Sequence, residues 1–359
     1  GYWMAGRGNG NGMEGSFILP IVNAYDLIAD AQVGGAPLLT EDERLAIERD
    51  LLLEAATLFI SDPANNNKSI SNQTAAAAIG VVLGEPSLVH FGLKGFNQML
   101  GSWYQPDGSP NESPAYGLQV IGYLLRLGEI LNGYSEPEDY VPPAGQQRLE
   151  RYSVYDRADY RMVFRTIGDS LLPSLTYPVV GDSYMTSKPG GSLLAIGATR
   201  TGLPILTSLM RHGGFDFTLA GADYLLYRPD NLDAATPIML PDVLFPQWRL
   251  AYLRGGEDHM DSTAILNASG WGGHRHKDSL DFTYWANGGE ALSDLGYLWD
   301  NPHQNMTVRS AAHNLVVVDE KDQVTSNRGG SYRFYETAAP FKAAAAESRA
   351  YAETDVYNR

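Results

Sequence analysis

The amino-acid sequence predicts a multidomain α + β protein, in which a helical domain precedes an antiparallel β domain. Before about residue 230, apolar residues recur at helical spacing between short breaks. After this point, short aromatic or β-branched runs bounded by Gly or Asp are typical of strands. Residues 229–247 hold four prolines, which cannot continue a helix, and are predicted to be a linker.

The helical domain is expected to cover residues 1–228. Its clearest helix begins at Thr40, because Glu43 completes a capping box and apolar residues follow at helical spacing. The same spacing predicts further helices over residues 15–33, 72–84, 87–103, 114–132, 146–172, 191–211 and 215–227.

The β domain is expected to cover residues 248–359 as an antiparallel sheet or sandwich. Four short runs in this region are rich in the residue types that favour strands. The predicted strands are Trp248–Leu253, Thr263–Ala268, Leu280–Trp285 and Leu315–Val318.

The formal net charge of −16 over 359 residues argues against general affinity for nucleic acid or anionic membranes, which favour basic surfaces. No apolar run approaches the roughly 20 residues that cross a bilayer, so no membrane span is expected. The first residues show no secretion signal, and the absence of cysteine excludes disulfides without fixing a compartment. The chain as given is therefore expected to be soluble.

Residues 273–314 contain the densest group of side chains able to bind a metal or move protons. His274 and His276 would share one face if this segment were a strand. Together with Asp294 and His313, they supply the nitrogen and oxygen ligands that zinc accepts. Alternation along a strand alone would therefore favour one catalytic metal site that contains all four residues.

Two predicted helix starts could face an anionic ligand. Ser113 followed by Pro114 is a typical N-cap, which places Tyr116 in the first turn of its helix. Asn72 and Gln73 likewise open an Ala-rich helix. Unpaired backbone N–H groups at such a start favour a nearby anion by roughly 0.3–1 kcal/mol.

The order of several short segments resembles that of the heparinase II/III family of polysaccharide lyases. These segments reach from about residue 20 to about residue 320, and their joint order is more specific than any one of them. The resemblance implies an incomplete α/α toroid followed by an antiparallel β-sandwich. The matching segments are Tyr25–Ile28, Asn72–Thr74, Pro106–Tyr116, His274–Asp278, Asp294–Gly296 and Ala312–Asn314.

The resemblance also implies roles for individual residues. Asn72, with Gln73, would bind and neutralise the carboxylate of a uronic acid. Tyr116 would donate a proton to the glycosidic oxygen, and His274 would be the complementary base. The position that matches Gln73 is often a histidine in related enzymes, which leaves open that Tyr116 serves as both base and acid. The further residues expected to contact substrate are Glu112, Arg275 and Arg309.

By the same resemblance, His276, Asp294 and His313 would hold a structural zinc ion that supports the loop presenting His274. This division between a metal site and a base requires a bulge or turn near Arg275. The single catalytic metal site with all four residues stays the alternative. No organic cofactor is implied.

The resemblance therefore implies a lyase that cleaves a uronic-acid polysaccharide, such as alginate, a glycosaminoglycan or ulvan, by β-elimination. The C5 proton is removed, the C4 oxygen is expelled, and an unsaturated uronate forms. Two alternatives stay open: a uronate C5-epimerase, which returns the proton to the opposite face, and a carbohydrate-binding protein without turnover. The family also implies a periplasmic or secreted location and an anionic polysaccharide as partner.

Overall fold

The computed structural model describes residues 14–62, 64–215, 225–298, 301–324, 326, 329–338, 341–351, 354 and 357–359. It contains two compact units. The first, the helical unit, comprises residues 1–102 and 119–157. The second, the mixed unit, comprises residues 103–118 and 158–359. Within the described residues, no helix is long and apolar enough to cross a membrane.

The helical unit is built from helices joined by short connections. Its elements are α1 (Gly15–Ile28), the hairpin β1 (Gln32–Val33) and β2 (Ala36–Pro37), α2 (Glu41–Ile47), the π-helix η1 (Glu48–Leu53), α3 (Glu54–Ile60), α4 (Ile70–Leu83), most of α5 (Pro86–Trp103) and α6 (Pro114–Leu131), and η2 (Val154–Asp156).

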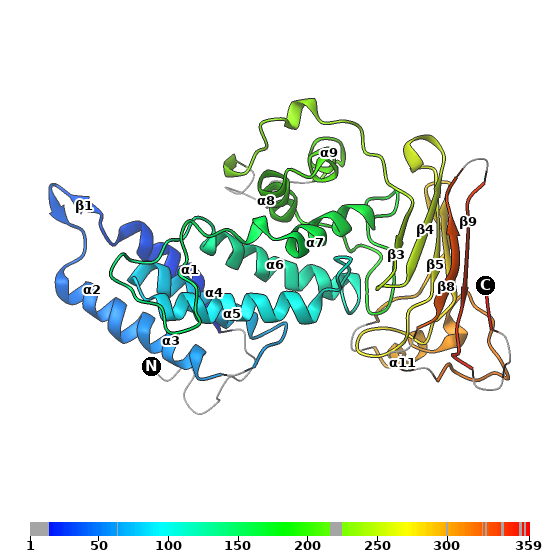
Figure 1. The fold of residues 1–359 in the computed structure, drawn as a ribbon, viewed down its shortest axis with the longest axis horizontal. Helices are drawn as coiled ribbons and strands as arrows, with labels where there is room; N and C mark the ends of the chain where they lie inside the picture. Colours follow the sequence, from blue (N-terminus) through cyan, green and yellow to red (C-terminus); the bar gives the residue numbers. More distant parts are fainter. Residues whose placement is uncertain are drawn as a thin grey trace. The chain divides into compact units, whose positions relative to one another are not determined.

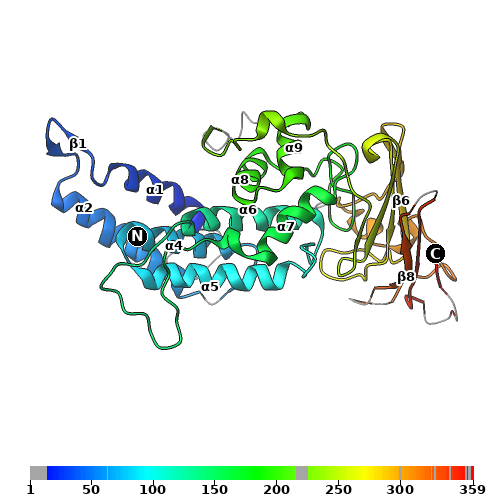
Figure 2. The ribbon, with the colours of Figure 1, turned by 45° about the horizontal axis from the view of Figure 1, so that its top comes forward.

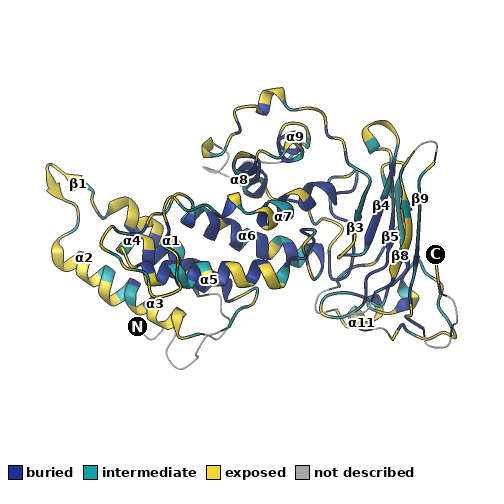
Figure 3. Ribbon diagram, viewed as in Figure 1, coloured by how far each residue is buried: buried dark blue, intermediate teal, exposed yellow. Residues whose placement is uncertain are grey.

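Helix α4 forms the centre of this unit. It is buried along most of its length, whereas α2 is exposed (Figure 3). Apolar residues of α1, η1 and α3 pack against its alanine-rich surface, because small side chains allow the neighbouring helices to approach closely. The capping box predicted at Thr40 is confirmed: Glu43 N donates to Thr40 Oγ1 at 3.3 Å, and Thr40 N donates to Glu43 Oε2 at 2.8 Å.

The mixed unit combines helices with an antiparallel sheet. Its helical elements are α7 (Ala158–Asp169), α8 (Gly191–Thr201), α9 (Pro204–His212), η4 (Leu232–Ala234), η5 (Glu257–His259), α11 (Gln304–Thr307) and η6 (Ser310–Ala312). Five strands form one sheet in chain order: β3 (Val243–Phe245), β4 (Leu250–Gly255), β5 (Ser262–Asn267), β6 (Asp281–Ala286) and β7 (Gly289–Leu292). The separate pair consists of β8 (Ser331–Glu336) and β9 (Ala343–Glu347).

The five-stranded sheet is covered on both faces. Side chains alternate along β4, so Leu250 and Tyr252 join one apolar cluster while Ala251 joins the other. Loop residues that follow α7, including Leu172 and Val180, cover the first face. Strands β8 and β9 lie along the second face (Figures 1 and 2). The predicted order of a helical part followed by an antiparallel β part is confirmed.

Several predicted helices require correction. The helix expected over 146–172 begins only at Ala158, because the preceding segment pairs with the chain near Tyr134 through the Tyr134–Tyr152 bridge. The helix expected over 191–211 is divided, because Gly202 has a φ of 64° and Pro204 begins α9. Most of the helix expected over 215–227 lies outside the described residues.

The predicted strands are partly right. Three of them correspond to β4, β5 and β6, but residues 315–318 do not form a strand. They follow the turn at His313, where Leu315 N donates to the carbonyl of His313 instead of joining a ladder. Strands β8 and β9 were not predicted, and β3 lies inside the predicted linker 229–247. The domain bounds 1–228 and 248–359 stay a prediction. The compact units divide the chain at residues 103, 119 and 158.

Candidate active site and metal site

Asp107 anchors the loop before α6 to the chain that precedes strand β4. Its carboxylate accepts hydrogen bonds from the backbone N–H groups of Gln247 at 2.9 Å and Trp248 at 3.3 Å. Gly108 next to it has a φ of 77°, and a Cβ there would lie 2.4 Å from the carbonyl oxygen of Met162. Any side chain at this position would clash, so glycine is required in the loop that leads to Glu112 and α6.

The first turn of α6 is fixed by residues 182 and 183. Gly117 N donates to the carbonyl of Ser113, which therefore occupies the predicted N-cap position. The Ser113 hydroxyl donates to the carbonyl of Asp182 at 2.9 Å, and Ala115 N donates to Ser183 Oγ at 3.2 Å. These bonds join the start of α6 to a loop of the same unit and place Tyr116 in the first turn.

Tyr116 stacks on His274. The ring centroids are 3.7 Å apart, and the ring planes differ by 17°. Burial raises the pKa of Tyr116 well above its ordinary value, and a hydrogen bond with Tyr297 raises this pKa further. The phenol therefore stays protonated at neutral pH, which suits a proton donor. Tyr297 was not predicted to be near the site, and its ring centroid lies 5.9 Å from that of Tyr184.

His274 belongs to a turn, not to a strand. Arg275 N donates to the carbonyl of Gly272 at 3.1 Å, and Gly273 has a φ of 60°. Such a turn is what the sequence-based prediction required if His276 is to bind a metal while His274 acts as the base. The His274 side chain is 32% exposed, and its Nε2 lies 3.6 Å from Glu112 Oε2.

Asp182 is a neighbour of both histidines that was missed in the sequence. Its Oδ2 lies 2.7 Å from His274 Nδ1, and its Oδ1 lies 3.1 Å from His276 Nε2. The hydrogen bond with Asp182 raises the pKa of His274 despite the opposing effect of burial. Burial raises the pKa of Asp182, but the hydrogen bonds and charges of His274 and His276 outweigh it and lower that pKa.

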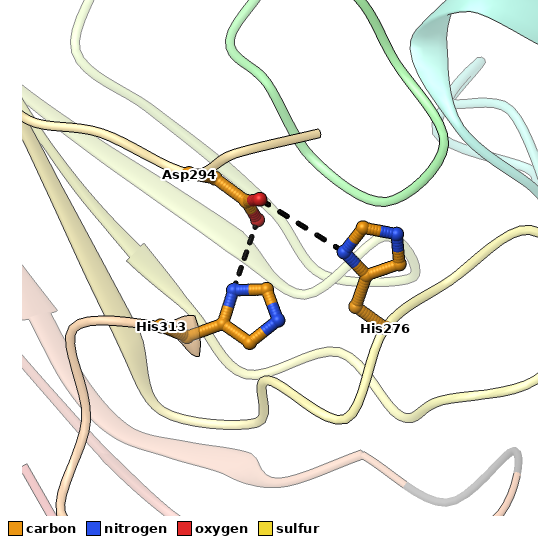
Figure 4. Close-up of side chains that lie close together, drawn as sticks. All are labelled: His276, Asp294 and His313. Carbon is orange, nitrogen blue, oxygen red and sulfur yellow. Dashed lines mark ion pairs between the residues drawn. The ribbon is translucent and has the colours of Figure 1, made fainter. Parts of the chain in front are cut away.

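His276, Asp294 and His313 come together in one buried cluster (Figure 4). His276 Nδ1 lies 3.9 Å from Asp294 Oδ1, and His313 Nδ1 lies 3.1 Å from Asp294 Oδ2. One potential ligand atom of each residue lies within 4.8 Å of the other two. The three residues come from three separate loops, so one ion between them would connect all three.

The polar atoms of this cluster fit a metal ion. Apart from their ion pairs with one another, His276 Nδ1, Asp294 Oδ2 and both ring nitrogens of His313 have no hydrogen-bond partner among the described residues. Buried polar atoms without partners are costly, whereas two imidazoles and a carboxylate are a common ligand set for zinc. The cluster could therefore hold a divalent ion.

The surroundings of the cluster favour positive charge. Burial alone lowers the pKa of His313, but Asp294 and the nearby carboxylates of Asp278 and Asp281 outweigh burial and raise that pKa to about 9. Burial, reinforced by Asp278 and Asp294, raises the pKa of Asp281 to about 7. Asp278 accepts a hydrogen bond from Asn267 Nδ2 at 2.9 Å. These acidic groups would lower the free energy of a bound cation.

Two arginines expected to contact substrate differ in their surroundings. The Nε and Nη2 atoms of Arg275 are buried and have no hydrogen-bond partner among the described residues. Burial, and then the charge of Arg249, lowers the pKa of Arg275. Arg309 is exposed and pairs with Asp322, with Nε and Oδ2 3.3 Å apart. Their contact with substrate stays a prediction.

Asn72 and Gln73 lie in the helical unit, on the first turns of α4. Both are almost fully buried. Asn72 Oδ1 accepts a hydrogen bond from Gly15 N at 2.7 Å, which ties the start of α1 to α4. Gln73 packs against α5, where a Cβ at Gly95 would lie 2.1 Å from Gln73 Oε1. Their role toward a substrate carboxylate stays a prediction.

Comparison with protein families supports the resemblance stated from the sequence. Residues 240–359 match the family model described as heparinase II/III-like, C-terminal. An alginate lyase of Stenotrophomonas maltophilia (strain K279a) is 23% identical over 379 residues, covering 93% of this chain and 47% of that protein. An exo-oligoalginate lyase of Saccharophagus degradans is 25% identical over 344 residues, covering 86% of this chain and 44% of that protein.

Solved structures show the same fold. A heparinase III matches with a TM-score of 0.66 at 15% identity, over 94% of this chain and 49% of that one. The heparan sulfate lyase HepC from Pedobacter heparinus matches with a TM-score of 0.63 at 14% identity, again over 94% and 49%. The chain thus spans about half the length of the relatives that it matches.

Proposed function

We propose that the chain acts as a polysaccharide lyase on a uronic-acid polymer, because residues 240–359 match the heparinase II/III-like C-terminal family model and the fold resembles that of a heparinase III. The observation that carries the proposal is the stacked pair of Tyr116 and His274, with Asp182 behind the histidine. One side chain is a phenol held protonated, and the other is an imidazole with one nitrogen directed away from Asp182. An acid and a base side by side suit an elimination.

The proposed reaction removes the C5 proton and breaks the bond from C4 to the glycosidic oxygen. The electron pair of the C–H bond forms the C4–C5 double bond, and the expelled oxygen takes a proton from Tyr116. His274 Nε2 accepts the C5 proton. Positioned proton transfer of this kind contributes about 10²- to 10⁴-fold to the rate.

The carboxylate of the uronic acid must be neutralised before C5 becomes acidic enough. We assign this role to the amides of Asn72 and Gln73. Loss of one hydrogen-bond donor to a developing oxyanion typically costs about 2.7 to 4 kcal/mol. A metal ion held by His276, Asp294 and His313 would stabilise the loops around His274, so we assign it a structural role.

We propose alginate or its oligosaccharides as the first substrates to test. The relatives with 23% and 25% identity are named alginate lyases, whereas the heparinase and heparan sulfate lyase structures share only 14–15% identity. A periplasmic or secreted location is also part of the proposal. It rests on the family resemblance alone.

The decisive experiment is a lyase assay of the purified protein against alginate, heparan sulfate, hyaluronan and ulvan. The unsaturated product is followed by its ultraviolet absorbance. We expect a signal on at least one polymer that is lost in Tyr116→Phe and His274→Ala. No absorbance, together with deuterium from solvent appearing at C5, would replace the lyase with the epimerase. Binding without either change would indicate a carbohydrate-binding protein.

A further inference from the structure

We propose that Asp182 is a positioning residue that links His274 to the cluster of His276, Asp294 and His313. It would determine which ring nitrogen of His274 and of His276 carries the hydrogen. The sequence offers no direct sign of this role, because Asp182 lies 92 residues before His274. The inference rests on the proposed function only where His274 is the base. Its structural part concerns three side chains of the mixed unit.

The two oxygens of Asp182 serve different histidines. Oδ2 lies 2.7 Å from His274 Nδ1, and Oδ1 lies 3.1 Å from His276 Nε2. An ionised carboxylate can only accept hydrogen bonds, so each of these nitrogens must carry a hydrogen. In the neutral imidazoles, the lone pairs are therefore left on His274 Nε2 and on His276 Nδ1.

Each remaining lone pair points toward the partner that its proposed role requires. His276 Nδ1 faces the other members of its cluster and lies 3.9 Å from Asp294 Oδ1. An imidazole that binds a metal commonly donates its other N–H to a carboxylate, which orients the ring and strengthens the ligand. On the other side, His274 Nε2 is free of Asp182 and can accept a proton.

Asp182 is itself held in place from several directions. Its own N–H donates to the carbonyl of His274 at 2.9 Å, and its carbonyl accepts from the Ser113 hydroxyl at 2.9 Å. The preceding Gly181 has a φ of 61°, and a Cβ there would lie 2.3 Å from the His274 carbonyl oxygen. The main chain of Asp182 is thus held by contacts that do not involve the imidazole rings.

The Asp182→Asn variant tests the proposal, because an amide has nearly the same shape but only one acceptor oxygen. It cannot accept N–H bonds from both histidines with separate oxygens. Zinc affinity is measured by competition with a chromophoric chelator, and we expect it to fall about 10- to 100-fold. The matched control is Glu112→Gln, which alters the other carboxylate beside His274 without touching His276, and we expect wild-type zinc affinity.

A second measurement needs no variant. In the zinc-free wild type with ¹⁵N-labelled histidine, NMR at alkaline pH reports which ring nitrogen carries hydrogen. We expect hydrogen on Nδ1 of His274 and Nε2 of His276, with signals assigned through His274→Ala and His276→Ala. In Asp182→Asn, at least one of the two imidazoles should change tautomer, and thermal unfolding shows whether the zinc-free variant is folded.

Two results would overturn the proposal. One is the opposite tautomer at either histidine of the wild type. The other is a folded Asp182→Asn protein that binds zinc as tightly as the wild type. Neither readout uses a polysaccharide. If the wild type cleaves no polymer, the proposed function fails while the assignment of Asp182 still stands or falls on its own.

Discussion

At the scale of single residues, the proposed chemistry depends on Tyr116. Replacing it with phenylalanine keeps the aromatic ring and removes only the phenolic hydroxyl group, the proposed proton donor. We expect kcat to fall by about 10²- to 10⁴-fold with little change in KM, because the donor acts in the transition state. Steady-state kinetics on the best polymer checks this. Tyr123→Phe, on the same helix α6, is the control and should retain activity.

Gly181 gives a second prediction at this scale. Its φ is 61°, and an added Cβ would lie 2.3 Å from the His274 carbonyl oxygen. Gly202 has a similar φ of 64°, but nothing lies within 4 Å of an added Cβ. Gly202→Ala should therefore cost roughly 1 kcal/mol of unfolding free energy, and Gly181→Ala clearly more, because it adds a backbone clash. Urea unfolding of both variants compares them, and equal losses would contradict the expectation.

The sequence could show the ligand types of this site but not all their neighbours. His276, Asp294 and His313 were predicted as one cluster, and the structure brings them together. Their selection required only the chemistry of metal ligands and the family resemblance. Asp182 and Tyr297 were missed, because each is one polar residue among many until the fold places it beside its partner.

At the scale of elements, the cluster of His276, Asp294 and His313 brings three loops together. His276 follows the turn at Gly272, Asp294 follows β7, and His313 follows η6. Adding zinc to the metal-free protein should therefore slow amide hydrogen exchange in all three loops together. Exchange followed by mass spectrometry measures this. Helix α4, in the other unit, serves as the internal control and should not change.

The same ion should raise the thermal stability of the protein. A ligand that binds only the folded state at 100 times its dissociation constant contributes about 2.7 kcal/mol. We expect Tm to rise with zinc and the rise to disappear in His313→Ala. Differential scanning calorimetry on zinc-free protein, with magnesium as the control ion, tests this. An equal rise in His313→Ala would place zinc elsewhere.

Element prediction succeeded where local chemistry decides the structure. Thr40 and Glu43 form the expected capping box, because the bonds lie within one turn. Strand β9 was missed because its sequence, Ala343–Glu347, is four alanines and a glutamate, which alone favour a helix. Pairing with β8 and packing on the sheet override that preference. A tertiary contact of this kind has no local signal.

At the scale of the whole molecule, the net charge of −16 should repel the proposed substrate, an acidic polysaccharide. We expect kcat/KM on a long polyuronate to rise with salt from low ionic strength toward 0.15 M, where the screening length is about 8 Å. A short uronate oligosaccharide carries fewer charges and should respond less. Initial rates at constant pH measure both. A fall with added salt would instead indicate that a local basic surface dominates.

The anchoring of residues 103–118 in the mixed unit has a practical consequence for dividing the gene. A segment that starts at residue 158 encodes the whole five-stranded sheet, the cluster of His276, Asp294 and His313, and His274, but it lacks Tyr116 and the Asp107 anchor. No single cut in the gene separates the two units cleanly, because the polypeptide leaves the first unit, enters the second, and returns. Complementation between separately expressed halves is thus a more informative dissection than truncation.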